Sequence, residues 1–102
     1  MTIMEKVLYV LRSRQFTVRF IGRHDWDGAY DWFWRVSISI YAPLPVSVLV
    51  HEVLHHLYPK KPEWWILEME TKVYERLTPK DRKYLSGVVG RARAHYEKEH
   101  GK

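Results

Sequence analysis

The sequence contains no cysteine, which excludes a disulfide framework and means that histidine and carboxylate side chains must hold any bound metal. Long apolar runs are also missing, and no stretch approaches the roughly 18 apolar residues of a membrane span. The segment from Met1 to Arg14 has charges within its apolar pattern and lacks the cleavage site of a signal peptide. These absences predict a soluble, cytoplasmic protein with no membrane partner.

Acidic residues are outnumbered by basic ones, with 12 Asp and Glu against 17 Lys and Arg, a net charge of +5. This balance permits attraction to acidic partners, including nucleic acid. The basic residues are spread along the chain, and none sits in an aromatic-interleaved motif of the kind that binds single strands. A solvated basic surface is therefore expected, and nucleic acid is not the expected partner.

A chain of 102 residues is expected to form one domain, residues 1–102. Apolar residues alternate over 16–20 and 32–40, with the turn signal Asp27-Gly28 between these segments, which predicts an antiparallel hairpin. Thr78 followed by proline predicts the start of a last helix. Helical spacing or caps predict helices over 2–13, 46–58, 63–77 and 79–99. The predicted fold class is α+β, with a small antiparallel β-sheet packed on a helix and the order α-β-β-α-α-α.

The second predicted helix carries the run His51-Glu52-Val53-Leu54-His55. Four residues make about one helical turn, so the imidazoles of His51 and His55 project from one side and can bind one ion. Glu52 lies about 100° further round the helix, beside the metal without being a ligand. This is the HExxH pattern, in which zinc acidifies a bound water and the glutamate takes its proton. The apolar residues of the helix fall on a separate face, which strengthens the prediction of a zinc site.

A catalytic zinc usually has three protein ligands, and HExxH supplies only two. The next predicted helix offers Glu63, Glu68, Glu70 and Glu75. Helical periodicity places Glu70 within the apolar face of that helix and Glu68 on the opposite side. An ionised carboxylate on a buried face is costly unless it is paired or bound to metal. Glu70 is therefore the predicted third ligand, and Glu68 is the alternative.

HExxH followed by a glutamate on a separate downstream helix resembles the gluzincin arrangement. The segments Gly28-Ala29-Tyr30-Asp31, Ser37-Ile38-Ser39-Ile40 and His51 to His55 resemble the core of small soluble gluzincins. These proteins include the minigluzincins and, more loosely, the SprT-like and ImmA-like proteins. The resemblance covers about Phe16 to Leu77. Its HExxH is specific for a zincin, and the rest is similarity of pattern.

The resemblance implies a zincin-like α+β fold in which the antiparallel sheet lies over the motif helix. It implies that His51 and His55 are zinc ligands and that Glu52 is the general base and acid. It also implies that the strand from Val36 to Tyr41 is the edge that pairs with an extended substrate.

Two features of this chain depart from the pattern. Many gluzincins carry an acidic residue four positions after the third ligand, where this chain has Lys72 after Glu68 and Tyr74 after Glu70. The third histidine of SprT-like proteins has no counterpart between His56 and the next helix. Among the minigluzincins the chain terminus can impose latency, and here His95 or His100 would be the blocking ligand.

The resulting prediction is a zinc metalloendopeptidase that acts on peptide or protein substrates, is either active or latent as an isolated chain, and is a monomer or weak homodimer. The alternative is an inactive zinc-binding module with a structural or regulatory role. A third hypothesis, a basic nucleic-acid-binding protein with an accidental HExxH, predicts salt-dependent binding that does not require His51.

Overall fold

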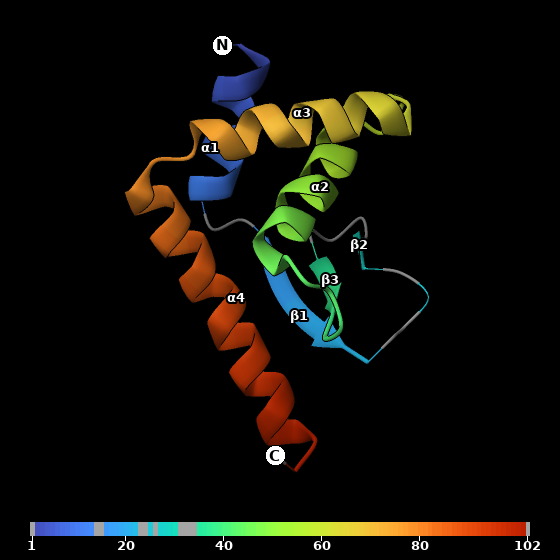
Figure 1. Cartoon of the computed structure of the whole chain (residues 1–102), viewed down its shortest axis with the longest axis vertical. Helices are drawn as coiled ribbons and strands as arrows, with labels where there is room; N and C mark the ends of the chain where they lie inside the picture. The colour runs from blue at the N-terminus through green and yellow to red at the C-terminus, as the bar shows by residue number, and fades with distance from the viewer. Residues whose placement is uncertain (1, 14–15, 23–24, 26, 31–34, 102) are drawn as a thin grey trace.

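The helix that carries the motif, α2 (Pro45–Leu57), lies over a small β-sheet in the computed structural model (Figure 1). The structure describes residues 2–13, 16–22, 25, 27–30 and 35–101. Pro45 occupies the first turn of α2, where its missing N–H costs no hydrogen bond. The buried residues of α2 include Leu49, Val50 and Leu54, so the helix packs along most of its length.

The sheet has three strands in the order β1-β3-β2. β1 (Thr17–Ile21) runs parallel to β3 (Arg35–Ser39), with Phe20 opposite Ile38. β2 (Gly28–Tyr30) runs antiparallel to β3 on the other side. The result is a mixed sheet with β3 in the centre, and α2 packs against β2 and β3.

The predicted antiparallel hairpin of residues 16–20 and 32–40 is wrong. The two segments pair in parallel, and a third strand, β2, supplies the antiparallel partner of β3. Gly28 begins β2 and does not belong to a hairpin turn, while residues 31–34 lie outside the described part of the chain. Alternation has the same period in both strand directions, so it could not reveal the parallel pairing.

The implied role of residues 36–41 as a free edge strand is also corrected. β3 is paired along its whole length with β1 on one side, and its residues Val36 to Ile38 are paired with β2 on the other. Of the described strands, β2 is the edge strand that lies next to α2. An extended peptide that joins this sheet near the motif must therefore pair with β2.

The four predicted helices are confirmed to within one or two residues at each end. Capping boxes start two of them, with Thr2 paired to Glu5 in one and Thr78 paired to Asp81 in the other. In each box the hydroxyl and the carboxylate satisfy backbone N–H groups that have no partner within the helix. The helices with capping boxes are α1 (Ile3–Arg12) and α4 (Pro79–Glu99), and the helix between α2 and α4 is α3 (Glu63–Arg76).

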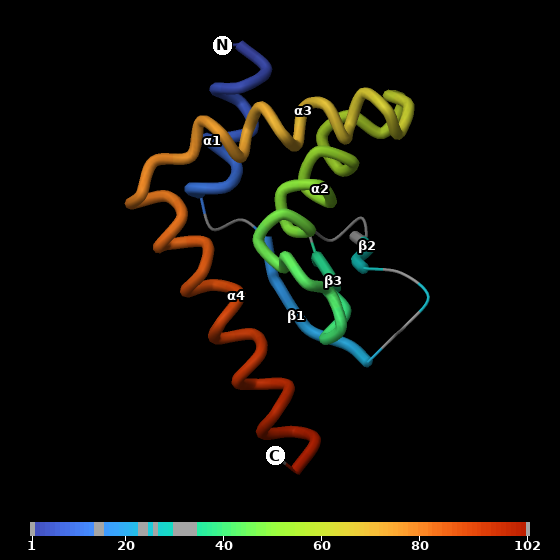
Figure 2. The backbone as a smooth tube through the Cα atoms, in the orientation of Figure 1, coloured from blue at the N-terminus to red at the C-terminus, as the bar shows by residue number. Residues whose placement is uncertain are grey.

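The helices surround α2 on the side away from the sheet and along one flank (Figure 2). α3 packs across α2, α1 packs against both, and α4 runs beside β1 and carries the C-terminus to the opposite end from the N-terminus (Figure 1). The core joins all these elements. Its fully buried side chains include Val7, Leu11, Ile38, Leu49, Val50, Val53, Leu54, Ile66, Val73 and Leu85. Within the described residues, no helix has both the length and the apolar character needed to cross a membrane.

Candidate metal centre and cleft

The two motif histidines lie side by side on the face of α2 that looks away from the core. The Nε2 atoms of His51 and His55 are 3.1 Å apart, and the ring centroids are 4.7 Å apart. One helical turn separates the two residues, and consecutive turns bring such side chains together. Both side chains are largely but not fully buried, with 17% and 26% of their surface exposed. A ligand can therefore reach both rings from the same side.

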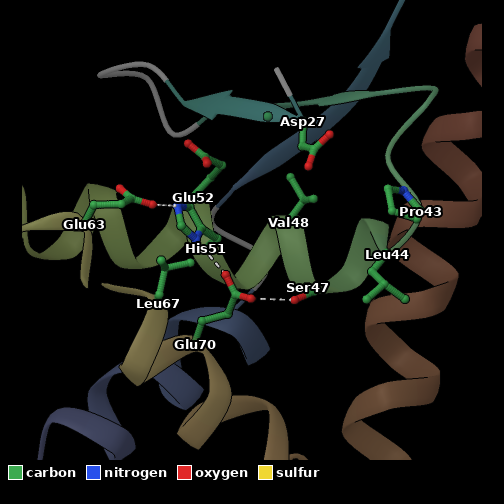
Figure 3. A pocket seen from close by; sticks show the side chains of 11 residues that line it. Asp27, Pro43, Leu44, Ser47, Val48, His51, Glu52, Glu63, Leu67 and Glu70 are labelled. Carbon is green, nitrogen blue, oxygen red and sulfur yellow. Dashed lines mark hydrogen bonds and ion pairs between the residues drawn. The ribbon is translucent and has the colours of Figure 1, made fainter. Parts of the chain in front are cut away.

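Glu63, the first residue of α3, reaches over both histidines. Its Oε1 lies 2.8 Å from His51 Nε2, and its Oε2 lies 2.9 Å from His55 Nε2 (Figure 3). The short connection over residues 58–62 places the start of α3 beside the end of α2, which brings the carboxylate to the rings. Glu63 was one of four glutamates that the predicted helix offered. It lies seven residues, about two helical turns, before Glu70 on the same side of the helix, but sequence reasoning ranked only Glu70 and Glu68 as ligands.

Glu70 approaches His51 from the other ring nitrogen. Its Oε1 lies 2.6 Å from His51 Nδ1, and its Oε2 accepts a hydrogen bond from Ser47 Oγ at 2.8 Å. Burial raises the pKa of Glu70, but the hydrogen bonds from His51 and Ser47 outweigh burial and hold this pKa below its ordinary value. The hydrogen bond to Glu70 also raises the pKa of His51. Glu70 thus lies on the Nδ1 side of His51, whereas the cluster forms on the Nε2 side.

The residues at the cluster have an arrangement typical of metal sites. When His51 donates its Nδ1–H to Glu70, the neutral ring presents a lone pair at Nε2, where the His55 ring and the Glu63 carboxylate also converge. Ligand atoms about 2.0–2.1 Å from a tetrahedral ion lie about 3.3 Å apart, close to the distances in this cluster. One ligand atom from each of His51, His55 and Glu63 can be chosen so that all three lie within 4.8 Å of one another. This group can hold a metal ion.

Glu52 points away from the histidine cluster toward β2 and is 8% exposed. Burial raises the pKa of its carboxyl to about 7, with Glu63 and Glu70 adding to the increase and His51 opposing it. β2 approaches this side chain closely because residue 28 is glycine. A Cβ at Gly28 would lie 2.4 Å from Val48 Cγ1 and 3.3 Å from Glu52 Cγ.

A cleft of about 400 Å³ contains these groups and lies between β2, α2 and the first half of α3 (Figure 3). The cluster occupies one part of it, and the cleft continues along α2 toward Leu44. Its acidic side chains come from three separate elements or loops. The lining residues are Asp27, Gly28, Pro43, Leu44, Ser47, Val48, His51, Glu52, Glu63, Leu67 and Glu70.

Other residues considered from the sequence lie elsewhere. Glu68, the alternative ligand, is exposed, and its Oε1 lies 3.6 Å from Lys72 Nζ on the same helix. His95 pairs with Glu99, and His100 stacks on Tyr96. Both tail histidines line a groove between β1 and α4, so in this structure neither approaches the cleft of α2.

Sequence reasoning missed Ser47 and did not select Glu63. The available signal for Ser47 was its position four residues before His51, one turn along the same helix face. Comparisons of the chain with protein-family models, curated proteins and solved structures found no match. The function is therefore inferred from the chemistry of the cleft.

Proposed function

We propose that this protein is a zinc-dependent peptidase in which His51, His55 and Glu63 hold the metal and Glu52 is the general base. The observation that carries the proposal is that two imidazole nitrogens and one carboxylate converge. The Nε2 atoms of His51 and His55 lie 3.1 Å apart, and each lies 2.8 or 2.9 Å from an oxygen of Glu63. A catalytic zinc site commonly has three such protein ligands and one open position. The cleft leaves the cluster accessible to a substrate.

Zinc is the proposed metal because the donor set is two imidazoles and one carboxylate, with no thiolate available in this cysteine-free chain. Imidazole suits zinc and other late first-row metals, whereas magnesium and calcium favour sites made of oxygen atoms. When bound, zinc supplies a Lewis acid that acidifies water and polarises a peptide carbonyl. A neutral His51 that donates its Nδ1–H to Glu70 would present Nε2 to the metal, and Ser47 donates a hydrogen bond to the same Glu70 carboxylate.

Glu52 has the properties that proton transfer requires. Its carboxylate enters the same cleft, is shielded from bulk water, and has a pKa raised to about 7. A carboxylate with a pKa near the working pH can take a proton from the attacking water and return it to the leaving amine. Because Glu52 does not join the histidine cluster, it stays available for this role.

The position of β2 supports an extended peptide as substrate. Gly28 of β2 and the preceding residue Asp27 form one wall of the cleft, and among the described strands β2 pairs only with β3. A peptide that adds to the other edge of β2 would run along the cleft past the cluster. Its scissile carbonyl would then lie between Glu52 and Glu63.

The alternative function is a zinc-binding module that stabilises the fold or binds another protein without catalysis. One observation favours it: the cluster joins α2 to the first residue of α3, so a metal would cross-link two helices. The two functions share the metal site and differ in the role of Glu52.

Zinc content and peptide cleavage measured on four single variants test the proposal. Glu63→Gln should lose zinc, and Glu68→Gln, an exposed glutamate of the same helix, should keep it. Glu70→Gln should keep zinc at reduced affinity, and Glu52→Gln should keep zinc and lose cleavage of an unstructured protein such as casein.

Each other outcome has a defined meaning. A wild-type protein that takes up no zinc would exclude both functions. Loss of zinc in Glu70→Gln with retention in Glu63→Gln would make Glu70 the third ligand. Full zinc occupancy without cleavage in the wild type would favour the non-catalytic module.

A further inference from the structure

The cleft continues beyond the metal cluster into a second part with a different chemistry. This part follows α2 toward its N-terminus, where Val48 and Leu44 add apolar surface to the lining. The Val48 side chain points toward Asp27, and the 65% exposed Leu44 points to the other side of the helix (Figure 3). Asp27, which precedes β2, projects its carboxylate from the opposite wall over Val48.

The charge of the cleft is opposite to that of the whole protein. The chain carries a net charge of +5, yet the described residues that line the cleft include four carboxylates and no lysine or arginine. Glu63 and Glu70 contact His51, and Glu52 is the proposed base. Asp27 has no role in the proposed reaction; its backbone oxygen accepts a hydrogen bond from Ser39 N–H, and among the described residues its carboxylate has no hydrogen-bond partner.

A second observation points to a cationic ligand. Glu52 is 8% exposed as a residue and lines the same cleft, and within the described part of the chain neither its carboxylate nor that of Asp27 has a hydrogen-bond partner. Two carboxylates that face a shared space without donors favour a positively charged group between or beside them.

The shape of this part of the cleft matches one kind of side chain. Lysine and arginine have an apolar stem and a cationic end, and they bury the stem along apolar surface while the end remains near polar groups. Val48 with the Asp27 carboxylate above it offers both contacts. A leucine or phenylalanine side chain in the same place would contact Val48 but would cover the Asp27 carboxylate without pairing its charge.

The distance along the helix indicates which substrate residue reaches this position. Val48 precedes His51 by three residues, which is about 4.5 Å along the axis of α2. An extended peptide advances about 3.3 Å per residue. The cationic side chain would therefore belong to a residue one or two positions from the scissile bond.

On these grounds we infer that the cleft selects peptides with lysine or arginine one or two residues from the scissile bond, and that Asp27 is the specificity-determining carboxylate. This inference depends on the proposed function, because it identifies the substrate class of the same cleft. Asp27 would bind the substrate side chain and would take no part in proton transfer.

The test compares matched peptides on zinc-loaded Glu52→Gln protein, which should bind substrates without cleaving them. Pairs of fluorescent peptides differ only by lysine or the uncharged norleucine at each of the two positions on either side of one peptide bond. Lysine should improve affinity about fivefold at one position, the upper range for a partly exposed ion pair. In Asp27→Asn the advantage should disappear, whereas the control Glu68→Gln should retain it.

A charge-reversal variant distinguishes a changed substrate preference from a general loss of binding by a damaged protein. Asp27→Lys should bind a glutamate peptide better than the lysine peptide at the same position. Equal affinity for lysine and norleucine, or a lysine preference that survives in Asp27→Asn, would overturn the inference and leave the peptidase proposal intact. Binding of neither peptide by the zinc-loaded protein would overturn both.

Discussion

At Gly28, β2 approaches α2 so closely that there is no room for a Cβ, and replacing Gly28 with alanine tests this packing directly. The added Cβ would lie 2.4 Å from Val48 Cγ1, 3.1 Å from the backbone oxygen of Ser37 and 3.3 Å from Glu52 Cγ. Val48 is β-branched and Ser37 O belongs to the sheet, so neither atom moves easily. We expect β2 to move away from α2 and the fold to lose stability.

Two opposing effects set the magnitude. Overpacking of this kind destabilises the fold by about 1–3 kcal/mol. Replacing glycine with alanine also lowers the conformational entropy of the unfolded chain, which stabilises the fold by about 0.4–1 kcal/mol. The overpacking term is larger, so Gly28→Ala should lower the free energy of unfolding by about 1–2 kcal/mol. In a domain of this size that corresponds to a decrease in Tm of about 4–16 °C. Urea denaturation and thermal melts followed by circular dichroism measure both quantities.

Gly90 provides the matched control, because a Cβ added there meets nothing within 4 Å. Gly90→Ala in the middle of α4 should raise stability by about 0.5–1 kcal/mol, the opposite sign. Combining Gly28→Ala with Val48→Ala should recover part of the loss, with a coupling of about 1 kcal/mol. A neutral Gly28→Ala, or effects of the two substitutions that simply add, would refute the close approach of β2 to α2.

Three further predictions concern the ion pair between α1 and α4 and the proposed zinc site. Arg12 forms two hydrogen bonds with Asp81 and, together with weaker hydrogen bonds from Thr78, lowers the Asp81 pKa from 3.8 to about 2. The pair therefore stabilises the fold above about pH 4, and its contribution is lost as the pH falls toward 2. Arg12 is half exposed, so Arg12→Met should lower the free energy of unfolding, measured by urea denaturation, by about 1 kcal/mol at pH 7 and by less at pH 3. A decrease that is the same at both pH values would contradict this. Glu70→Gln should weaken zinc binding about 10–100-fold in a competition assay with a chelating dye, and Ser47→Ala should weaken it less, since Ser47 acts through Glu70. Free zinc at about 100 times its Kd should raise the unfolding free energy of the wild type by about 2.7 kcal/mol and have little effect on that of Glu63→Gln. An equal increase in both proteins would exclude Glu63 as a ligand.

The helices could be predicted from the sequence because their signals are local. Thr78, Pro79 and Asp81 lie within one helical turn and define the start of α4 without reference to any other element. The same holds for His51, Glu52 and His55, whose relative placement follows from the geometry of a single helix. Residues on one helix face need no tertiary information to be brought together.

The sheet could not be predicted in the same way, because strand order and direction depend on partners far apart in the sequence. β2 has only three residues and begins with glycine, which leaves no alternating pattern to detect. Its position beside β3 nevertheless decides which edge faces the cleft. The pairing of β1 with β3 links residues 18 positions apart, such as Phe20 and Ile38, and only the folded chain determines it.

The sequence by itself determined that His51 and His55 share one face of a helix with Glu52 about 100° further round, and that the next helix offers glutamates as candidates for a third ligand. The helical wheel correctly indicated that Glu70 is half-buried, but burial alone does not distinguish a ligand from a residue that hydrogen-bonds a ligand. The tertiary structure placed Glu63 on the Nε2 side of both rings and Glu70 on the Nδ1 side of His51. The physical reason is that the path of the chain between α2 and α3 fixes the distance across two helices, and helical periodicity describes only one helix at a time.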